Sequence, residues 1–357
     1  MEITNSLLPS TCAVSVIMPM YNVEKYISES LDSLLNQTFK DFEVIVINDC
    51  STDNSRQIAE SYLEKFGGRL KIFDNEKNSG AGASRNNGLL KASGEYVFNM
   101  DSDDSILLTA LEKLYKVAKE YNADVVNGLG FYITSEDSKE ITRIISNKRV
   151  LTNENDIQID EDLSWRLEKP LTYRYYGSPC LRLSRRDFLL ENKIFFPENV
   201  KRGEDIVWKH GFLLCAKRIV HVPFIFYFYR MSETSLSRRK RNIYEIINSR
   251  MTTIIDGIKW IDDIMNKVKF FDQNPQYRYK ILEDFTANIF KRLFMYTKKN
   301  KCSTNEFYNT VREEFGEKLG KYDVLVAELC ALLDAQKRQH YTLSEKVKAA
   351  NLQTDKE

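Results

Sequence analysis

Three carboxylates, Asp101, Asp103 and Asp104, stand within four residues directly after a β-type run, Glu95 to Met100. Carboxylates this close repel one another unless a cation lies nearby. Mg²⁺ and Mn²⁺ prefer oxygen ligands, commonly one or two carboxylates together with substrate phosphates. The spacing of Asp101 and Asp103 lets one side chain face a metal and the other a ribose or water. An Asp-x-Asp triplet is common by chance, however, and the cluster could instead cap the following helix.

Two further polar clusters, Met20-Tyr21-Asn22 and Asn48-Asp49-Cys50-Ser51, also follow β-type runs. In open α/β sheets, ligands bind beyond the carboxyl ends of the strands. Three polar clusters at equivalent strand ends are therefore expected to converge on one crevice. The alternative for any single cluster is an ordinary turn, which Asn, Asp and Ser favour.

The first third of the chain alternates short β-type runs with helical patterns, which predicts an α/β fold with a largely parallel sheet covered by helices. Strands are expected at 13–18, 43–47, 70–73 and 95–100, near 124–127, more weakly around 131–145, and at 220–229. Helices are expected at 24–35, 83–91, 109–121 and 205–215, from apolar residues at helical spacing.

Beyond about Arg238 the sequence is charged and helix-forming, with almost no Gly or Pro. We therefore expect an α/β domain over residues 1–237 and a helical region over 238–357. Between Ile289 and Tyr296, apolar residues interleave with basic ones. Such a helix packs on its own domain or on a partner helix, which would make a homo-oligomer, or it lies on an anionic membrane. We favour packing.

Composition excludes several classes of protein. Lys and Arg number 52 against 51 Asp and Glu, so the basic excess of a nucleic-acid binder is missing. The six cysteines form no CxxC pair and no secretory signal precedes them, which indicates reduced thiols. No apolar stretch is long enough to span a bilayer. We expect a cytoplasmic protein that at most rests on the inner face of the membrane.

Four motifs in fixed order over roughly the first 105 residues carry a family resemblance. The stretches VSVIMPMYNVEKYISESLDSLLNQTF, VIVINDCSTDNS and NSGAGASRNNGLLKASGEYVFNMDSDD resemble family 2 glycosyltransferases of the GT-A fold. The resemblance continues more loosely through Gly203-Glu204-Asp205 and Tyr229-Arg230 to Arg239, but not into the helical region. It implies a Rossmann-like mixed, mostly parallel sheet with flanking helices, followed here by a helical extension.

The resemblance also implies a donor site. In the first donor loop the backbone and Tyr21 would contact the nucleobase, and Glu24 would support the loop. Asp49 would accept a hydrogen bond from uracil, although Asn48 and Cys50 replace the frequent Asp and Gly beside it. Arg85 would neutralise phosphate, or else form a structural salt bridge. The complete implied donor set is Pro19, Tyr21, Asn22, Glu24, Asp49, Asn78, Arg85, Asp101, Ser102, Arg230, Ser235 and Arg238.

The reaction expected from the resemblance needs a cation and a base. A nucleoside diphosphate leaves with negative charge, which a bound cation stabilises and preorganised donors assist. Asp103 would be the direct metal ligand and Asp101 a less certain one. The acceptor hydroxyl needs a general base, which the resemblance assigns to Asp205, with Glu204 as its neighbour. The alternative for this pair is a helix N-terminus that favours carboxylates.

The expected function is an inverting hexosyl- or N-acetylhexosaminyltransferase. It would move a sugar from a UDP-sugar, with Mn²⁺ or Mg²⁺, to a hydroxyl of a glycan or lipid-linked glycan, as in surface polysaccharide synthesis. One rival, a sugar nucleotidyltransferase, needs a Gly-rich basic loop after the first strand, where Tyr21 to Glu24 offers none. A second rival, an NAD(P) oxidoreductase, needs a GxGxxG motif after the first strand, and this sequence has none there. A non-catalytic nucleotide-sugar-binding or scaffold protein is disfavoured by the intact Asp101, Asp103 and Asp205 set.

Overall fold

The computed structural model describes residues 10–136, 140–146, 156–168, 177–200, 202–231 and 242–299, together with residues 309 and 313. These residues fall into two compact units. The first takes in what is described of 1–239 and 256–284, and the second what is described of 240–255 and 285–357. The predicted catalytic residues that the structure describes all belong to the first unit.

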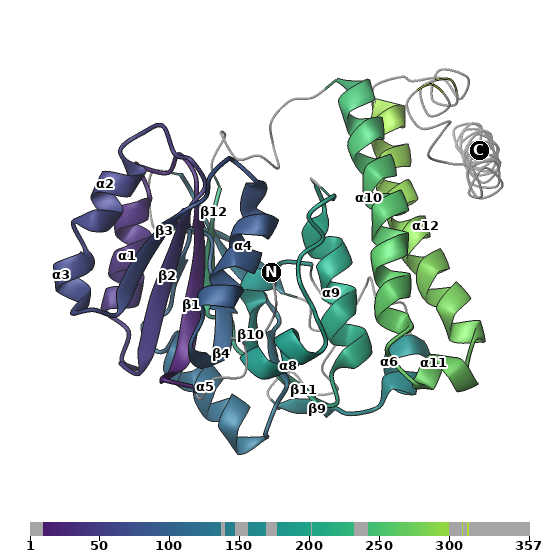
Figure 1. Cartoon of the computed structure of the whole chain (residues 1–357), viewed down its shortest axis with the longest axis horizontal. Coiled ribbons are helices and arrows are strands. Elements are labelled where there is room, and N and C mark those ends of the chain that lie inside the picture. Colours follow the sequence, from purple (N-terminus) through teal and green to yellow (C-terminus); the bar gives the residue numbers. More distant parts are fainter. Residues whose placement is uncertain are drawn as a thin grey trace, which may run out of the picture. The chain divides into compact units, whose positions relative to one another are not determined.

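The main sheet of the first unit is mixed and mostly parallel, as the sequence predicts (Figure 1). Strands β3-β2-β1-β4 run parallel, β10 lies antiparallel between β4 and β6, β11 is parallel to β6, and β9 is an antiparallel edge. Residues 13–20 of β1 are all buried, because both of its faces are covered. In sheet order the strands are β3 Leu70–Asp74, β2 Phe42–Asn48, β1 Cys12–Met20, β4 Gly94–Asn99, β10 Arg182–Arg185, β6 Val125–Gly128, β11 Ile219–Val222 and β9 Gln158–Asp160.

A second sheet has the order β5-β12-β7-β8, with bounds Ser105–Ile106, Tyr227–Arg230, Gly130–Thr134 and Ile141–Ser146. The single strand expected at 220–229 is wrong, because the chain leaves β11 after Val222 and enters β12 at Tyr227 in the other sheet. Pro223 lies at the break, and a proline cannot donate to a strand ladder. Strand β12 therefore pairs with β5 and β7.

Two helices near the crevice differ from prediction in where they begin. Helix α1 spans Ile27–Leu35 rather than starting at residue 24, because the backbone N–H of Glu24 donates to Asp53 in the neighbouring loop. Helix α4 spans Gly80–Lys91 and starts three residues earlier than expected. The other helices of this unit are α2 Ser55–Glu60, α3 Leu63–Phe66, α5 Ala110–Glu120, α6 Leu163–Glu168, η3 Pro179–Leu181, α8 Arg186–Glu191, α9 Glu204–Cys215 and α11 Phe270–Gln273.

The described residues of the C-terminal part are helical, as expected. Helices α10 Ile243–Met265 and α12 Gln276–Lys299 each contribute to both units. Within the first unit, Gly211 of α9 leaves room for Trp260, since a Cβ there would lie 2.8 Å from the indole. Of the interleaved apolar and basic residues between Ile289 and Tyr296, Ile289 and Leu293 are buried, and the side chains of the others lie outside the described residues. None of the described helices is both long and apolar enough to cross a membrane.

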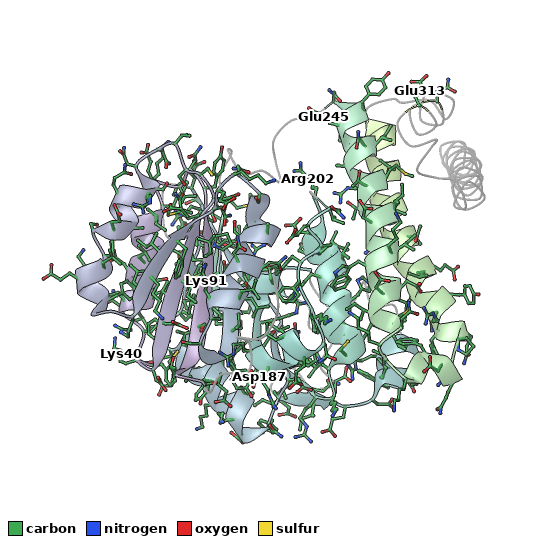
Figure 2. All side chains as sticks on the ribbon, viewed as in Figure 1. Lys40, Lys91, Asp187, Arg202, Glu245 and Glu313 are labelled. Carbon is green, nitrogen blue, oxygen red and sulfur yellow. The ribbon has the colours of Figure 1, made fainter. Side chains whose placement is uncertain are left out.

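Charged side chains lie on the outside of the first unit, as Lys40 and Lys91 illustrate (Figure 2). The enclosed layer between sheet and helices is apolar instead. It includes Val14, Val16 and Met18 of β1 with Leu31 and Leu34 of α1, all essentially inaccessible to solvent. This core holds the strand ends, and with them the polar clusters, in fixed positions.

Cys50, just past β2, has a left-handed backbone with φ 63°. A side chain in this conformation costs about 1–2 kcal/mol, which glycine avoids. We predict that Cys50→Gly unfolds with a free energy about 1 kcal/mol higher than Cys50→Ala. Both variants lose the thiol's contact with the carbonyl of Asn75, 3.4 Å away, so the difference isolates the backbone. Urea denaturation measures it, and equal stability of the two variants would contradict the strain.

Candidate active site

The loops that follow β1 and β2 are tied together by side chains predicted to belong to the donor site. The Asn22 carboxamide oxygen accepts from the Thr52 backbone N–H at 2.8 Å, and the Asn22 N–H donates to the Ser51 hydroxyl at 3.2 Å. The Glu24 carboxylate accepts the Asn54 backbone N–H at 3.0 Å. Asn22 and Glu24 therefore hold the two loops together, and their contact with a donor stays a prediction.

Tyr21 and Pro19 sit differently at the end of β1. Pro19 is buried within the strand, paired with Ile47 of β2. Tyr21 follows the strand and exposes 45% of its surface. The Tyr21 ring is thus accessible for stacking, whereas Pro19 fixes the backbone beneath it.

Asp49 is only 3% exposed, and its carboxylate caps the N-terminus of helix α4, about thirty residues further along the chain. One carboxylate oxygen accepts from the Ser79 backbone N–H and from the Asn75 carboxamide, and the other accepts from the Gly80 backbone N–H, each at 2.8 Å. Anionic groups are favoured at helix N-termini, which explains why α4 begins at Gly80. Asn78 joins the same cluster by donating to the Asp49 carbonyl at 3.2 Å. The second oxygen of Asp49 retains acceptor capacity, so the uracil contact stays a prediction.

Arg85 projects from α4 into the protein and is 5% exposed. Its guanidinium contacts an Asp101 carboxylate oxygen at 2.5 Å and lies 5.3 Å from the centre of the Phe196 ring. Burial alone would lower the pKa of Arg85, but the carboxylate of Asp101, followed by smaller interactions with Cys180 and Glu204, outweighs it and raises that pKa. Arg85 is therefore a fixed cation between Asp101 and Glu204.

The acidic cluster forms a tight turn, in which the Asp104 backbone N–H donates to the Asp101 carbonyl at 3.2 Å. Burial raises the pKa of Asp103 to about 6, and the charge of Asp101 adds to the rise while Arg230 opposes it. Asp104 is 2% exposed, and burial together with Asp103 raises its pKa well above the ordinary range. Asp101 is partly accessible, with 36% of its side chain exposed.

Arg230, at the end of β12, holds this turn from the other side. Its backbone N–H donates to the Asp104 carboxylate at 2.8 Å, and its Nε donates to the Asp103 carbonyl at 2.9 Å. Its two terminal nitrogens reach the Glu136 carbonyl at 2.8 Å and the Glu29 carboxylate at 2.6 Å. All three guanidinium nitrogens thus have protein partners, and the structure gives Arg230 a structural role. Ser235 and Arg238, the other predicted phosphate donors, lie outside the described residues.

The predicted base lies in the first turn of α9, after Gly203 in a left-handed conformation. One Asp205 carboxylate oxygen accepts from the backbone N–H of Ile206 at 2.8 Å. Burial raises the pKa of its neighbour Glu204 to about 7, as does the charge of Asp205, while Arg85 opposes the rise. Helix α9 starts against α4, since a Cβ on Gly82 would lie 3.1 Å from the Glu204 side chain.

The structure thus brings together two predicted groups that lie about a hundred residues apart in the sequence. Asp101 and Glu204 both act on Arg85. Among the described residues, no group of three or more His, Cys, Asp or Glu side chains is arranged to hold a metal ion. A cation at Asp103 and Asp101 would therefore complete its coordination with substrate phosphates and water, as Mg²⁺ commonly does.

Several other candidates prove to be structural. Trp208 is 1% exposed and stacks on Phe196 at 4.7 Å, so it belongs to the core and is no platform for an acceptor sugar. His210 is buried, and burial lowers its pKa to about 3. His221 is buried beside Asn127. The tyrosines at 173, 175 and 176 lie outside the described residues.

Sequence reasoning missed Ser30 and Tyr227. The Ser30 hydroxyl reaches the carbonyls of Ser102 and Asp104 at 2.8 and 2.6 Å, and the Tyr227 hydroxyl accepts the Asp101 backbone N–H at 3.1 Å. Ser30 lies on the apolar stripe of a predicted helix, and a polar residue there is a signal that could have been used. Ser102 itself is 4% exposed, so its predicted donor contact stays a prediction.

Comparison with known proteins points to one family of enzymes. The sequence profile described as Glycosyl transferase family 2 matches residues 15–177. The chain is 27% identical over 274 residues to glycosyltransferase GlyG of Streptococcus pneumoniae serotype 4, covering 74% of this chain and 87% of GlyG. It is 31% identical over 278 residues to the uncharacterized glycosyltransferase YibD of Escherichia coli K12, covering 75% of this chain and 77% of YibD.

A third relative is TarS of Staphylococcus aureus, named a poly(ribitol-phosphate) β-N-acetylglucosaminyltransferase. It is 36% identical over 217 residues, which cover 57% of this chain but only 33% of TarS. The structure of TarS 1–349 in complex with UDP-GlcNAc matches with a TM-score of 0.54 and 24% identity, covering 86% of this chain and 92% of that one. At this identity the likeness concerns the fold.

The fold is of the GT-A type. The chain belongs to glycosyltransferase family 2, and the enzyme is a glycosyltransferase.

The raised pKa of Asp103 yields a test of the acidic turn. Folded Asp103 keeps its proton up to about pH 6, whereas an unfolded aspartate ionises near about pH 4. The folded state binds more protons in that interval and loses stability as pH rises through it. In EDTA, Asp103→Asn should exceed the wild type in unfolding free energy by on the order of 1–2 kcal/mol at about pH 7.5. At about pH 4.5 the unfolding free energies of the variant and the wild type should nearly agree.

Urea denaturation at both pH values measures this difference. Asp41→Asn, at an exposed position before β2, is the matched control and should show no such dependence. The same stability difference at both pH values would show that the Asp103 carboxylate is not destabilised by its surroundings.

Proposed function

We propose that this enzyme transfers a sugar from a UDP-sugar to a hydroxyl of a glycan or lipid-linked glycan, with inversion at the anomeric carbon. The observation that carries the proposal is the placement of Arg85, which contacts the carboxylate of Asp101 and lies within the electrostatic reach of Glu204. In this proposal the predicted diphosphate loop and the predicted base border one crevice. The UDP-GlcNAc complex of TarS, which shares the fold, supports the choice of donor.

In this proposal the nucleotide lies across the carboxyl ends of β1, β2 and β4. Tyr21 provides an exposed ring for the uracil, and Asp49, with Asn78 bound to its carbonyl, provides an acceptor for the base N–H. Asn22 and Glu24 keep the loop in place. Arg85 and Asp101 border the ribose and diphosphate. Arg230 acts through the acidic turn, because its guanidinium nitrogens already bind protein groups.

The acidic turn fits a divalent cation. Asp103 carries a carboxylate whose ionisation is unfavourable in the protein alone, because of burial and of Asp101. A cation beside Asp103 and Asp101 would remove that penalty, and both residues offer the oxygen ligands that Mn²⁺ and Mg²⁺ prefer. When bound, the cation would supply charge stabilisation for the departing diphosphate. Arg85 adds a permanent positive charge on the α4 side.

Asp205 is the proposed base. Its position in the first turn of α9 leaves one oxygen bonded to its own helix and the other near Gly177, where a Cβ would lie 3.0 Å away. Inversion requires attack on the face of the sugar opposite the leaving diphosphate. Glu204, whose pKa lies at about 7, holds a proton near neutral pH and so lowers the negative charge beside Asp205.

The acceptor and the cellular site are further parts of the proposal. The name of TarS, a poly(ribitol-phosphate) β-N-acetylglucosaminyltransferase, favours a polymer as the acceptor, and we propose a surface glycan. We propose that residues 1–237 form the catalytic domain in the cytoplasm, at the inner face of the membrane. The helical region 238–357 would serve self-association or peripheral membrane contact. The transferred unit is a hexose or N-acetylhexosamine.

Two variants test the catalytic residues. Asp103→Ala removes the proposed metal ligand, and Asp205→Asn removes the base at constant shape. Each should reduce transfer, or hydrolysis of the donor, by about 10³-fold, since a general base alone contributes about 10²–10⁴-fold. Release of UDP from a panel of UDP-sugars measures this, with circular dichroism to confirm folding. Asp41→Asn should retain full activity. Full turnover in Asp103→Ala or in Asp205→Asn would refute its assigned role.

Donor binding can be tested without turnover. With Mn²⁺ present, UDP at about 100 times its dissociation constant should stabilise the protein by about 2.7 kcal/mol. The stabilisation should fall sharply in EDTA and in Asp103→Asn, and ADP should give less because Asp49 reads the uracil edge. Thermal denaturation provides the measurement. An equal shift with and without Mn²⁺ would overturn the metal assignment, and no shift with any nucleotide would favour the non-catalytic scaffold.

A further inference from the structure

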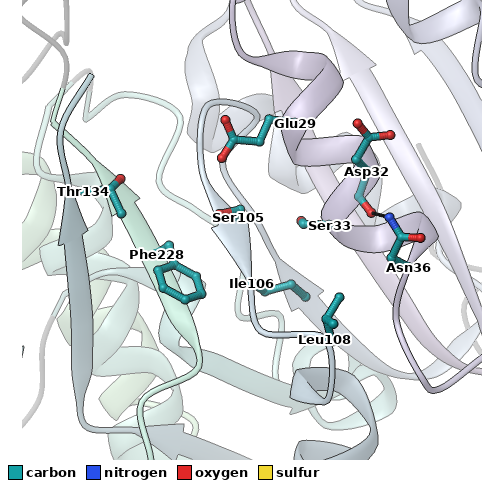
Figure 3. A pocket seen from close by; sticks show the side chains of 9 residues that line it. All are labelled: Glu29, Asp32, Ser33, Asn36, Ser105, Ile106, Leu108, Thr134 and Phe228. Atoms are coloured by element: carbon teal, nitrogen blue, oxygen red, sulfur yellow. Dashed lines mark hydrogen bonds between the residues drawn. The ribbon is translucent and has the colours of Figure 1, made fainter. Parts of the chain in front are cut away.

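A pocket of about 290 Å³ lies apart from the proposed donor site, between α1 and the second sheet (Figure 3). One wall is the face of α1 that carries Asp32, Ser33 and Asn36, and the opposite wall is β12 with Phe228. The described residues that line it include none of the predicted donor, metal or base residues. The proposed function therefore leaves this pocket unexplained.

The sheet side of the pocket is apolar and aromatic. Register places Ser105, Phe228 and Tyr132 in one row on neighbouring strands. The rings of Phe228 and Tyr132 stack at 5.1 Å, which fixes the Phe228 ring in the wall. Ile106 adds apolar surface, and Leu108 at the mouth is 56% exposed. An aromatic ring held in place beside aliphatic side chains offers a flat apolar surface to a ligand.

The helix side of the pocket is polar and rich in hydrogen-bond acceptors. Asp32 and Asn36 are exposed and adjacent, with the Asn36 carboxamide donating to the Asp32 carbonyl at 2.9 Å (Figure 3). Ser33 lies between them on the same wall. The described lining contains no Lys or Arg, and phosphate recognition uses such cations. A nucleotide or another anion is therefore a poor match.

The acidic side chains of the pocket do not demand a cationic ligand either. Glu29 is already paired with Arg230 at 2.6 Å. Asp32 accepts the Tyr62 hydroxyl at 3.0 Å and keeps capacity for further hydrogen bonds. What remains is one exposed carboxylate, small hydroxyls and one amide around an aromatic ring, all of which can bind the hydroxyls of an uncharged ligand.

We propose that this pocket binds a neutral pyranose unit of the glycan that the enzyme extends. A pyranose has one apolar C–H face for Phe228 and a rim of hydroxyls for Asp32, Ser33 and Asn36. The volume lies at the lower end of the ~300–1,000 Å³ range of ligand pockets, which suits a sugar ring rather than a nucleotide sugar. The ligand's origin in the acceptor rests on the proposed function, while the site itself rests on the lining residues.

The pocket is connected to the acidic turn through the ion pair between Glu29 and Arg230. Glu29 lines the pocket and pairs with Arg230, which binds the Asp103 carbonyl and the Asp104 carboxylate. A glycan held here would be anchored to the same body that carries the turn, at a point separate from the reacting hydroxyl. Such an anchor raises the effective concentration of the acceptor end.

Saturation-transfer NMR on the full chain tests the site directly. The probes are the methyl β-glycosides of glucose, galactose and N-acetylglucosamine at millimolar concentration, in EDTA and without nucleotide. At least one should bind the wild type, while glucose 6-phosphate, which adds an anion to the ring, should bind more weakly. Ser33→Trp fills the pocket and should abolish the signal. Gln57→Trp, which places the same ring on exposed helix α2, should keep it.

A second variant of nearly unchanged shape keeps the test valid if Ser33→Trp misfolds. Asp32→Asn removes a charged acceptor and should weaken binding by about tenfold. Absence of any glycoside signal in the wild type, a signal unchanged in Ser33→Trp, or preferential binding of tetralysine would each overturn the proposal. Asp103→Ala should abolish transfer but leave glycoside binding intact. The two proposals can thus fail separately.

Discussion

The acidic turn after β4 imposes the strongest constraint on this structure, because it gathers three carboxylates within four residues, one of them buried and two half-buried. Two arginines from distant parts of the chain compensate for it. Arg85 comes from α4 and contacts the Asp101 side chain, whereas Arg230 comes from β12 and binds the Asp103 and Asp104 groups. Helix α4, the turn and β12 must therefore keep their mutual positions for the protein to remain stable.

That compensation is incomplete. Neither arginine cancels the burial of Asp103 and Asp104, so both keep raised pKa values. A turn that needs positive charge and leaves Asp101 partly exposed is suited to bind a cation together with a charged substrate. The stability of the isolated protein and its capacity for a cation are thus two consequences of one arrangement of charges, as is common where function works against local stability.

The sequence predicted what local pattern determines and missed what depends on distant partners. The buried strands β1, β2, β3 and β4 follow from continuous apolar runs, so the polar clusters at their ends could be placed. The start of α4 could not be predicted, because its cap is the carboxylate of Asp49, which lies just after β2. Arg230 looked like a phosphate ligand, since nothing near it in sequence reveals Glu29 and Asp103 as its partners. Similarly, Asp205 could be assigned only through the family resemblance.

Strand β12 shows how a short element can serve two surfaces at once. Successive side chains of a strand point to opposite faces, so Tyr227 and Phe228 necessarily diverge. Tyr227 is completely buried and its hydroxyl accepts the Asp101 backbone N–H, while Phe228 stacks on Tyr132 in the wall of the α1 pocket. Two residues later the strand ends in Arg230, whose backbone and side chain both bind the acidic turn. A shift of β12 by one residue would exchange these faces and remove both sets of contacts. The break at Pro223, which moves the chain from the main sheet into the second one, is therefore what allows a single four-residue strand to support the acidic turn and the pocket together.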